Sequence, residues 1–180
     1  MRQPSLFLRG KKIPLLCAVL LSLSSATASA GAGIGVQVGL VPSLFSGEPL
    51  SAECALTCKF DALPFVFAPR VCIAASHVSS VEFAMDIWVG NPVIGSSIVH
   101  FFYGPGLVGS WQPPYDGNGF SQDWQCFAGT RFVTGFNAFV SDSVELYGQT
   151  AFEMGIVLAE AFDVNFRMRF PVETGIRFWF

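Results

Sequence analysis

The chain has 180 residues, of which 52% are hydrophobic, 14% aromatic and only 13% charged. Ten Lys and Arg oppose 13 Asp and Glu, so the formal net charge is −3 at pH 7. A nucleic-acid partner requires a basic surface, and this balance argues against one. The length suits one domain.

Residues 1–30 have the three parts of a secretory signal peptide. Cations lie within residues 2–12, an apolar run spans 13–23, and small residues follow as far as Ala28-Ser29-Ala30. The apolar run is shorter than the ~20 residues that a transmembrane helix needs. We predict cleavage at the site formed by Ala28 and Ala30, which leaves an exported domain at 31–180.

Alternation of apolar with polar or small residues, typical of β-strands, runs through much of the exported domain. The first predicted strand spans 33–41, and residues 42–79 hold two more, whose limits are blurred by four prolines. Residues 80–89 alternate cleanly, with Glu82 and Asp86 on the inward face. Residues 90–96 contain Asn-Pro and two glycines, which predicts a turn.

Four further strands are predicted at 97–109, 124–140, 144–158 and 164–180. A loop rich in Pro, Gly and Asp separates the first two, at 110–123, and short connections at 141–143 and 159–163 imply antiparallel hairpins. The total is eight strands. No apolar run after residue 30 is long enough for a membrane helix, so a membrane-spanning domain would be a β-barrel.

The final strand has one apolar and one charged face. Its even-numbered residues from Val164 to Phe180 are nearly all large and apolar, whereas Arg167, Arg169, Glu173 and Arg177 lie opposite. An outer-membrane barrel needs such a strand, because its outer face contacts lipid and its inner face is polar. We therefore predict an all-β fold, an eight-stranded antiparallel up-and-down transmembrane β-barrel.

Loop lengths predict a register for the last three strands. Pairing Leu158 with Val164, and Val140 with Val144, brings opposite charges together on the inward face. The resulting neighbours are Glu153 with Arg169, Glu145 with Arg177, Arg131 with Glu153, and Tyr147 with Gly175. An interior charge must be neutralised by a partner in so narrow a barrel.

These residues form a predicted lumen charge network. Its members are Arg131, Glu153, Arg169, Glu145, Arg177, Glu82, Asp86 and His100. We favour the interpretation that the network is a structural plug that fixes register and fills the lumen. The other interpretation is a polar constriction that selects what passes.

His100 lies opposite Asp86 if Val89 pairs with Ser97, and a His beside a carboxylate can act as an acid-base pair. A satisfied interior polar pair is the favoured interpretation. No Ser-His-Asp arrangement can be assembled by spacing, so we do not expect an enzyme.

The exported domain contains four cysteines, which are Cys54, Cys58, Cys72 and Cys126. An oxidising compartment permits one or two disulfides among them, and three full pairings are open. The Cys54-x3-Cys58 spacing lacks a second pair or a suitably spaced His. We therefore expect no metal site and no cofactor.

The export signal, the alternating strands and the closing segment Gly175-Ile176-Arg177-Phe178-Trp179-Phe180 resemble the small outer-membrane β-barrel superfamily, which includes the OmpA transmembrane domain, OmpX and OmpW. The resemblance implies the outer membrane of a double-membraned bacterium and contact with its lipid. It also implies that Phe178 and Phe180 belong to the signal read by the barrel assembly machinery.

The function expected from this resemblance is a narrow conduit for small, hydrophobic solutes, as in OmpW-like barrels, with inward aromatics such as Trp88 and Phe102 lining the lumen. The alternative is a structural or adhesive surface protein with a plugged lumen, as in OmpX-like barrels. A soluble lipocalin-like carrier, with the two faces inverted, is disfavoured because the exported domain has a single Lys, Lys59. A barrel enzyme would need a catalytic Ser and His that cannot be placed.

Overall fold

The computed structural model describes residues 31–42, 50–61, 63–74, 77–92, 98–117, 120–159 and 163–180. The predicted signal peptide, residues 1–30, lies outside these ranges, and its cleavage stays a prediction. In the described ranges every regular element is a β-strand. These ranges hold no helix that is long and apolar enough to cross a membrane.

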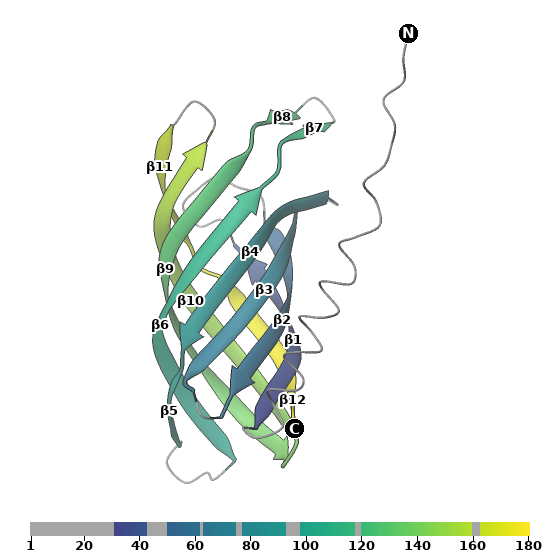
Figure 1. The fold of residues 1–180 in the computed structure, drawn as a ribbon, viewed down its shortest axis with the longest axis vertical. Helices are drawn as coiled ribbons and strands as arrows, with labels where there is room; N and C mark the ends of the chain where they lie inside the picture. Colours follow the sequence, from purple (N-terminus) through teal and green to yellow (C-terminus); the bar gives the residue numbers. More distant parts are fainter. Residues whose placement is uncertain are drawn as a thin grey trace.

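The strands wind around a common axis in an up-and-down order (Figure 1). In chain order they are β1 (Ala32–Val41), β2 (Ser51–Phe60), β3 (Phe65–Ala74), β4 (His77–Ile87), β5 (Val89–Pro92), β6 (Val99–Gln112), β7 (Tyr115–Gly117), β8 (Phe120–Gln122), β9 (Gln125–Ser141), β10 (Val144–Ala159), β11 (Val164–Arg169) and β12 (Val172–Trp179).

The sheet closes on itself, because β1 pairs with β2 on one side and with β12 on the other. Strands β4 and β5 act as one barrel strand interrupted at Trp88, and β11 and β12 as one interrupted at Phe170 and Pro171. Counted in this way the barrel has eight strands, all paired antiparallel, and the predicted fold class is confirmed. Closure leaves no long unpaired edge.

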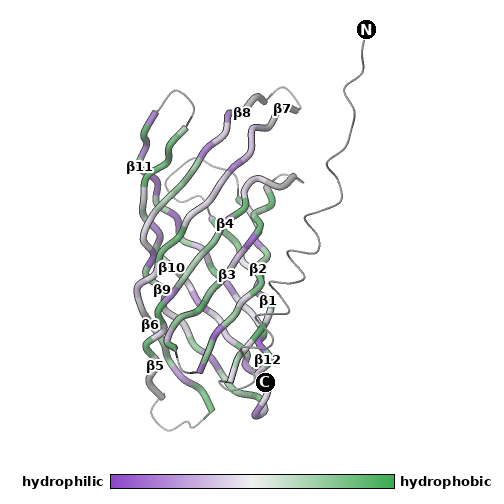
Figure 2. Tube along the Cα trace, viewed as in Figure 1, coloured by the Kyte–Doolittle hydropathy of each residue, from purple (hydrophilic) through white to green (hydrophobic). Residues whose placement is uncertain are grey.

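The two faces of the wall differ in polarity, and the alternation is visible along each strand in Figure 2. Outward side chains such as Val36 and Phe132 are about half exposed, at 51% and 50%. Inward ones such as Glu145 and Arg177 are fully buried, at 0%. Apolar residues therefore face outward and charges inward, so the inverted, lipocalin-like arrangement is wrong.

Three connections differ from the sequence predictions. The predicted turn at 90–96 begins with strand β5, whose Val89 pairs with Tyr103, and residues 93–97 lie outside the described ranges. The predicted loop at 110–123 contains the end of β6 and the small hairpin of β7 and β8. Strand β4 begins at His77 rather than at residue 80.

One half of the barrel is taller than the other. Strands β6, β9 and β10 have 14, 17 and 16 residues, whereas β1, β2 and β3 have 10 each. The taller strands rise, together with β7, β8 and β11, at the end of the barrel away from the C-terminus (Figure 1). We call this extension the ridge.

Candidate functional site: the barrel interior

The middle of the barrel is filled by charged side chains. Three arginines and five carboxylates meet there, all at most 7% exposed. This central cluster consists of Glu53 from β2, Arg70 from β3, Glu82 and Asp86 from β4, Arg131 from β9, Glu153 from β10, Arg169 from β11 and Glu173 from β12. Each reaches the axis because strand alternation turns it inward.

Arg70 is the centre of the cluster. One guanidinium nitrogen, Nη1, lies 2.6 Å from Glu173 and 3.0 Å from Glu53, and Nη2 lies 3.1 Å from Glu153. Its Nε lies 3.4 Å from Glu82. A single side chain thus joins carboxylates from four strands, which ties opposite sides of the wall together across the lumen.

Arg131 and Arg169 extend the cluster on either side. Arg131 pairs with Asp86 at 2.9 Å and with Glu173 at 3.0 Å. Arg169 pairs with Glu82 at 2.7 Å. Glu153 binds both of these arginines, at 3.0 Å and 2.7 Å, in addition to Arg70.

The cluster carries more negative than positive charge, since three guanidinium groups face five carboxylates. Removing a charge from water costs several kcal/mol unless partners compensate it. Neutral donors supply part of that compensation: Gln149 donates a hydrogen bond to Glu173, and Ser80 donates one to Glu82 at 3.1 Å. The cluster has fewer arginines than carboxylates, so each arginine pairs with more than one acid.

A second group of polar and aromatic side chains lies nearer the C-terminal end. Glu145 accepts hydrogen bonds from Arg177 at 2.7 Å, from Asn137 at 2.7 Å and from Trp179 at 3.0 Å. Above it the Tyr147 hydroxyl donates to Gln37 at 3.0 Å. This group is separate from the central cluster, since Arg177 pairs with Glu145 alone among the described carboxylates.

Aromatic packing completes the filling at this level. Trp88 and Phe102 stack with ring centroids 3.7 Å apart, and Tyr147 meets Trp88 edge-on at 5.5 Å. Gly175 provides the space for the Tyr147 ring, because a Cβ there would lie 2.5 Å from Tyr147 Cζ and 2.7 Å from the Val36 carbonyl oxygen. The rings of Trp88, Phe102 and Tyr147 therefore fill the lumen together at this level.

The register of the last strands is the one that loop length predicts. Glu153 lies opposite Arg169 and Arg131, Glu145 opposite Arg177, and Tyr147 opposite Gly175. The match begins at Glu145, because an irregularity at Val144 pairs that residue with Ser141 instead of Val140.

The predicted pairing of His100 with Asp86 is wrong. Asp86 lies opposite Gly106, and His100 lies opposite Pro92 and Asn137. The reason is that the hairpin does not turn at residue 90 but continues through β5, which shifts the register by six residues. Asp86 joins the central cluster, whereas His100 faces the C-terminal end of the lumen.

Sequence reasoning missed two members of the central cluster, Arg70 and Glu53. Both lie in the stretch 42–79, where prolines blurred the strand limits. Strand alternation could have found them, because adjacent residues of a strand point to opposite faces. Cys54 and Val71 face outward, so their neighbours Glu53 and Arg70 face inward. Glu173 was placed on the inward face but without a partner.

The four cysteines in the described ranges are free thiols in the structure, and the possible disulfides among them stay a prediction. Cys54 is exposed and Cys72 is buried on the opposite face of the wall, which prevents these neighbouring residues from bonding. Possible metal ligands from Glu53, Cys72 and Glu82 lie within 4.8 Å of one another. Arg70 already pairs with both carboxylates, and we assign no metal to this group.

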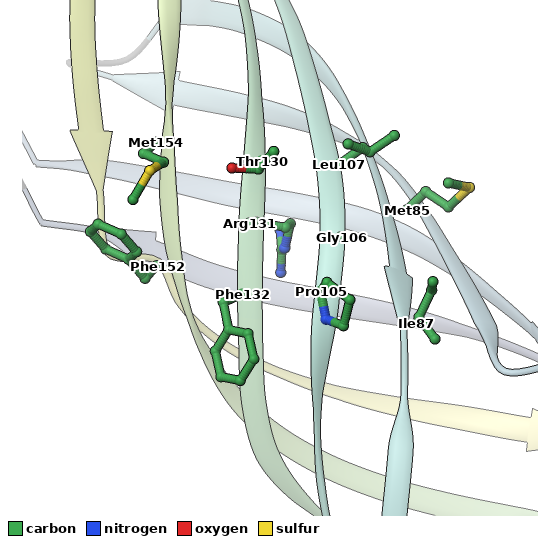
Figure 3. A pocket seen from close by; sticks show the side chains of 10 residues that line it. All are labelled: Met85, Ile87, Pro105, Gly106, Leu107, Thr130, Arg131, Phe132, Phe152 and Met154. Carbon is green, nitrogen blue, oxygen red and sulfur yellow. The ribbon is translucent and has the colours of Figure 1, made fainter.

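Two apolar hollows lie on the outer wall of the barrel. One, of about 440 Å³, is lined mainly by outward apolar side chains such as Met85, Leu107, Phe132 and Met154 (Figure 3). Gly106 and Arg131, whose positions face the lumen, also line this hollow at its base. A second apolar hollow, of about 500 Å³, lies over β1, β2 and β3.

Comparison with solved structures finds two small barrels of this shape. The crystal structure of Neisserial surface protein A (NspA) matches with a TM-score of 0.51 and 15% identity, over 84% of this chain and 97% of that one. The N-terminal β-barrel domain of Pseudomonas aeruginosa OprF matches with a TM-score of 0.53 and 9% identity, over 82% and 97%. No family model matches the chain, and no curated protein matches its sequence. The chain therefore has the fold of the small eight-stranded outer-membrane β-barrels.

Proposed function

We propose that this protein is an integral outer-membrane barrel whose lumen is sealed and which acts at the cell surface through its ridge. The fold likeness and the outward apolar face support a membrane location, because half-exposed residues such as Val36 and Phe132 would contact lipid. Of the two functions expected from the sequence, this is the structural or adhesive one. It involves no catalysis.

The central cluster is the observation that carries the proposal. Arg70 contacts four carboxylates that come from four different strands, and its side chain has no exposed surface. A solute crossing the lumen would have to separate these contacts. Breaking one buried ion pair costs about 3–5 kcal/mol, so opening several at once would be rare.

The ridge supports a role at the surface. In the family orientation the chain ends face the periplasm, which places β7, β8 and the upper parts of β6, β9 and β10 outside the cell (Figure 1). Strand pairing continues into this part, since Gln112 lies opposite Gln125, and Gln125 opposite Ala159. A rigid sheet held above the membrane is a suitable platform for a macromolecular partner.

The test is solute flux through purified protein in liposomes. Liposome swelling in small sugars and amino acids, and uptake of a fluorescent apolar dye, should both equal those of protein-free vesicles. Flux of either kind above that level would contradict the proposal. Replacing residues 113–124 by a short turn should leave the barrel folded and remove binding of whole cells to immobilised extracellular matrix or serum proteins.

The second candidate is the narrow conduit for small apolar solutes with a lateral exit. The hollow over Gly106 favours it, because this apolar hollow on the outer wall is lined in part by Arg131, which belongs to the central cluster inside the barrel. Dye uptake without sugar flux would support this candidate. Such uptake should then fall when Leu107 at the rim of the hollow is replaced by Trp.

A further inference from the structure

A cavity of about 190 Å³ lies in the lumen at the C-terminal end, below the packed Trp88 and Phe102. We call it the vestibule. Its apolar walls are the rings of Trp88, Phe102 and Phe139, and its polar lining is Lys59, His100 and Asn137. It is separate from the ridge, which lies at the other end of the barrel, and from the central cluster.

The vestibule is lined by a cation that has no ion-pair partner among the described residues. Of the described side chains, Glu145 and Asp61 are the carboxylates whose charge acts on Lys59. The oxygens of Glu145 already accept bonds from Arg177, Asn137 and Trp179. Lys59 forms no ion pair with any residue in the described ranges. Arg177 therefore has Glu145 as its ion-pair partner, whereas Lys59 lines the cavity without a direct one in the described part of the chain.

Lys59 is held in place by aromatic rings. Its ammonium lies 5.0 Å from the centroid of Trp88 and 5.6 Å from that of Trp179. Gly33, which lies between Lys59 and Trp179 in the sheet, leaves room for this contact, because a Cβ there would lie 2.8 Å from the Trp179 ring. Cation–π contacts fix the ammonium but leave its N–H donors free for a ligand.

Two further polar atoms, on residues that line the vestibule, lack a hydrogen-bond partner within the described residues. They are the indole Nε1 of Trp88, a residue only 6% exposed, and Nδ1 of His100. A buried N–H without an acceptor costs about 1–3 kcal/mol, and a ligand oxygen would recover that cost. An ammonium and an orphaned indole donor on the lining of one cavity specify an acceptor with negative charge.

We propose that the vestibule binds a small carboxylate carried on a flat apolar ring. The carboxylate would accept hydrogen bonds from Lys59 and from the Trp88 indole, while the ring would lie against Phe102 and Phe139. The aromatic walls distinguish this ligand from inorganic phosphate, and the ammonium distinguishes it from a neutral aromatic. The inference does not depend on the proposed surface function, since it concerns the opposite end of the barrel.

The experiment is equilibrium dialysis of labelled benzoate against the full exported barrel in detergent micelles, with empty micelles as the blank. Benzoate should bind with one site, and benzyl alcohol and inorganic phosphate should each bind at least tenfold more weakly. Lys59→Met should weaken benzoate binding at least tenfold, and Lys59→Arg should retain it within about threefold. Arg167→Gln is the matched control, because it removes the same charge at the ridge end, and it should bind benzoate as the unmodified protein does.

Three results would overturn the proposal. They are absence of benzoate binding, equal binding by Lys59→Met, and phosphate binding as tight as that of benzoate. Heat-modifiable migration of each variant in electrophoresis shows that its barrel is folded, so loss of binding is not confused with loss of structure. Flux through the lumen would contradict the proposed function but would leave the benzoate result unaffected.

Discussion

Replacing Arg70 by Met is the most informative single change in the barrel. The side chain becomes shorter and loses its guanidinium group with its charge, and four carboxylates lose a partner. Glu82, Glu153 and Glu173 still pair with Arg131 or Arg169. Glu53 pairs with Arg70 alone among the described residues, so it would be left as a buried acid without a cation.

Leaving one partner of a buried ion pair uncompensated costs about 3–5 kcal/mol. We therefore expect Arg70→Met to lower the free energy of unfolding by that amount. Because most of the loss comes from the stranded Glu53, the double variant Arg70→Met with Glu53→Gln should recover about 2 kcal/mol of it. Recovery by removal of a second charge would distinguish the electrostatic cost from a packing defect at Arg70.

The assay is urea unfolding of the barrel in lipid vesicles, followed by tryptophan fluorescence, with heat-modifiable migration as a check that each variant folds. Arg167→Met is the control for loss of an arginine outside the central cluster, and it should cost less than about 1 kcal/mol. An Arg70→Met variant within 1 kcal/mol of the unmodified protein would refute the reasoning. So would a double variant no more stable than the single one.

Three other changes test separate parts of the account by the same unfolding assay. Glu153→Ala removes the acid that binds all three arginines of the central cluster and should cost about 3 kcal/mol or more, and unchanged stability would exclude a structural plug. Glu53→Gln alone should lower the free energy of unfolding by about 1 kcal/mol or less, because the cluster has more acids than arginines and the amide oxygen can still accept a hydrogen bond from Arg70. A loss as large as that of Glu153→Ala would contradict this excess of acids. Gly175→Val should destabilise by about 1–3 kcal/mol, because the new side chain overlaps Tyr147, and pairing it with Tyr147→Ala should recover part of the loss.

The register of the last three strands could be predicted from the sequence because two short connections and strand parity leave few alternatives. Glu153 and Arg169 illustrate this: once Leu158 is opposed to Val164, no freedom remains along the hairpin. A slip by one residue would turn the charges of the final strand to the outer face, where its apolar residues now lie.

Arg70 and Glu53 could not be paired from the sequence for a different reason. Glu53 and Arg70 lie on the neighbouring strands β2 and β3, whose limits the prolines blur, whereas the contacts of Arg70 with Glu153 and Glu173 cross the lumen and join strands that are not neighbours. Such contacts depend on the closed shape and narrow width of the barrel. The alternation of residues along one strand gives no information about either. Parity indicates that a side chain points inward but not which opposite strand it meets.

The error at His100 shows how a turn signal can mislead at a barrel rim. Asn91 and Pro92 predicted a turn, yet both pair with β6. Strand β5 has a neighbour on one side only, so the missing N–H of Pro92 can face the unpaired side without loss of a ladder bond. Gly90 and Pro92 therefore lie within an edge strand of this sheet and do not mark the point where that strand ends.

The central claim is that the charged cluster around Arg70 seals the lumen. Planar-bilayer recording of the purified barrel tests it most directly. The account predicts no conductance above that of the bare membrane for the unmodified protein, and openings only in a variant that removes the plug, such as Arg70→Ala with Glu153→Ala and Glu173→Ala. Steady ion conductance through the unmodified barrel would contradict it.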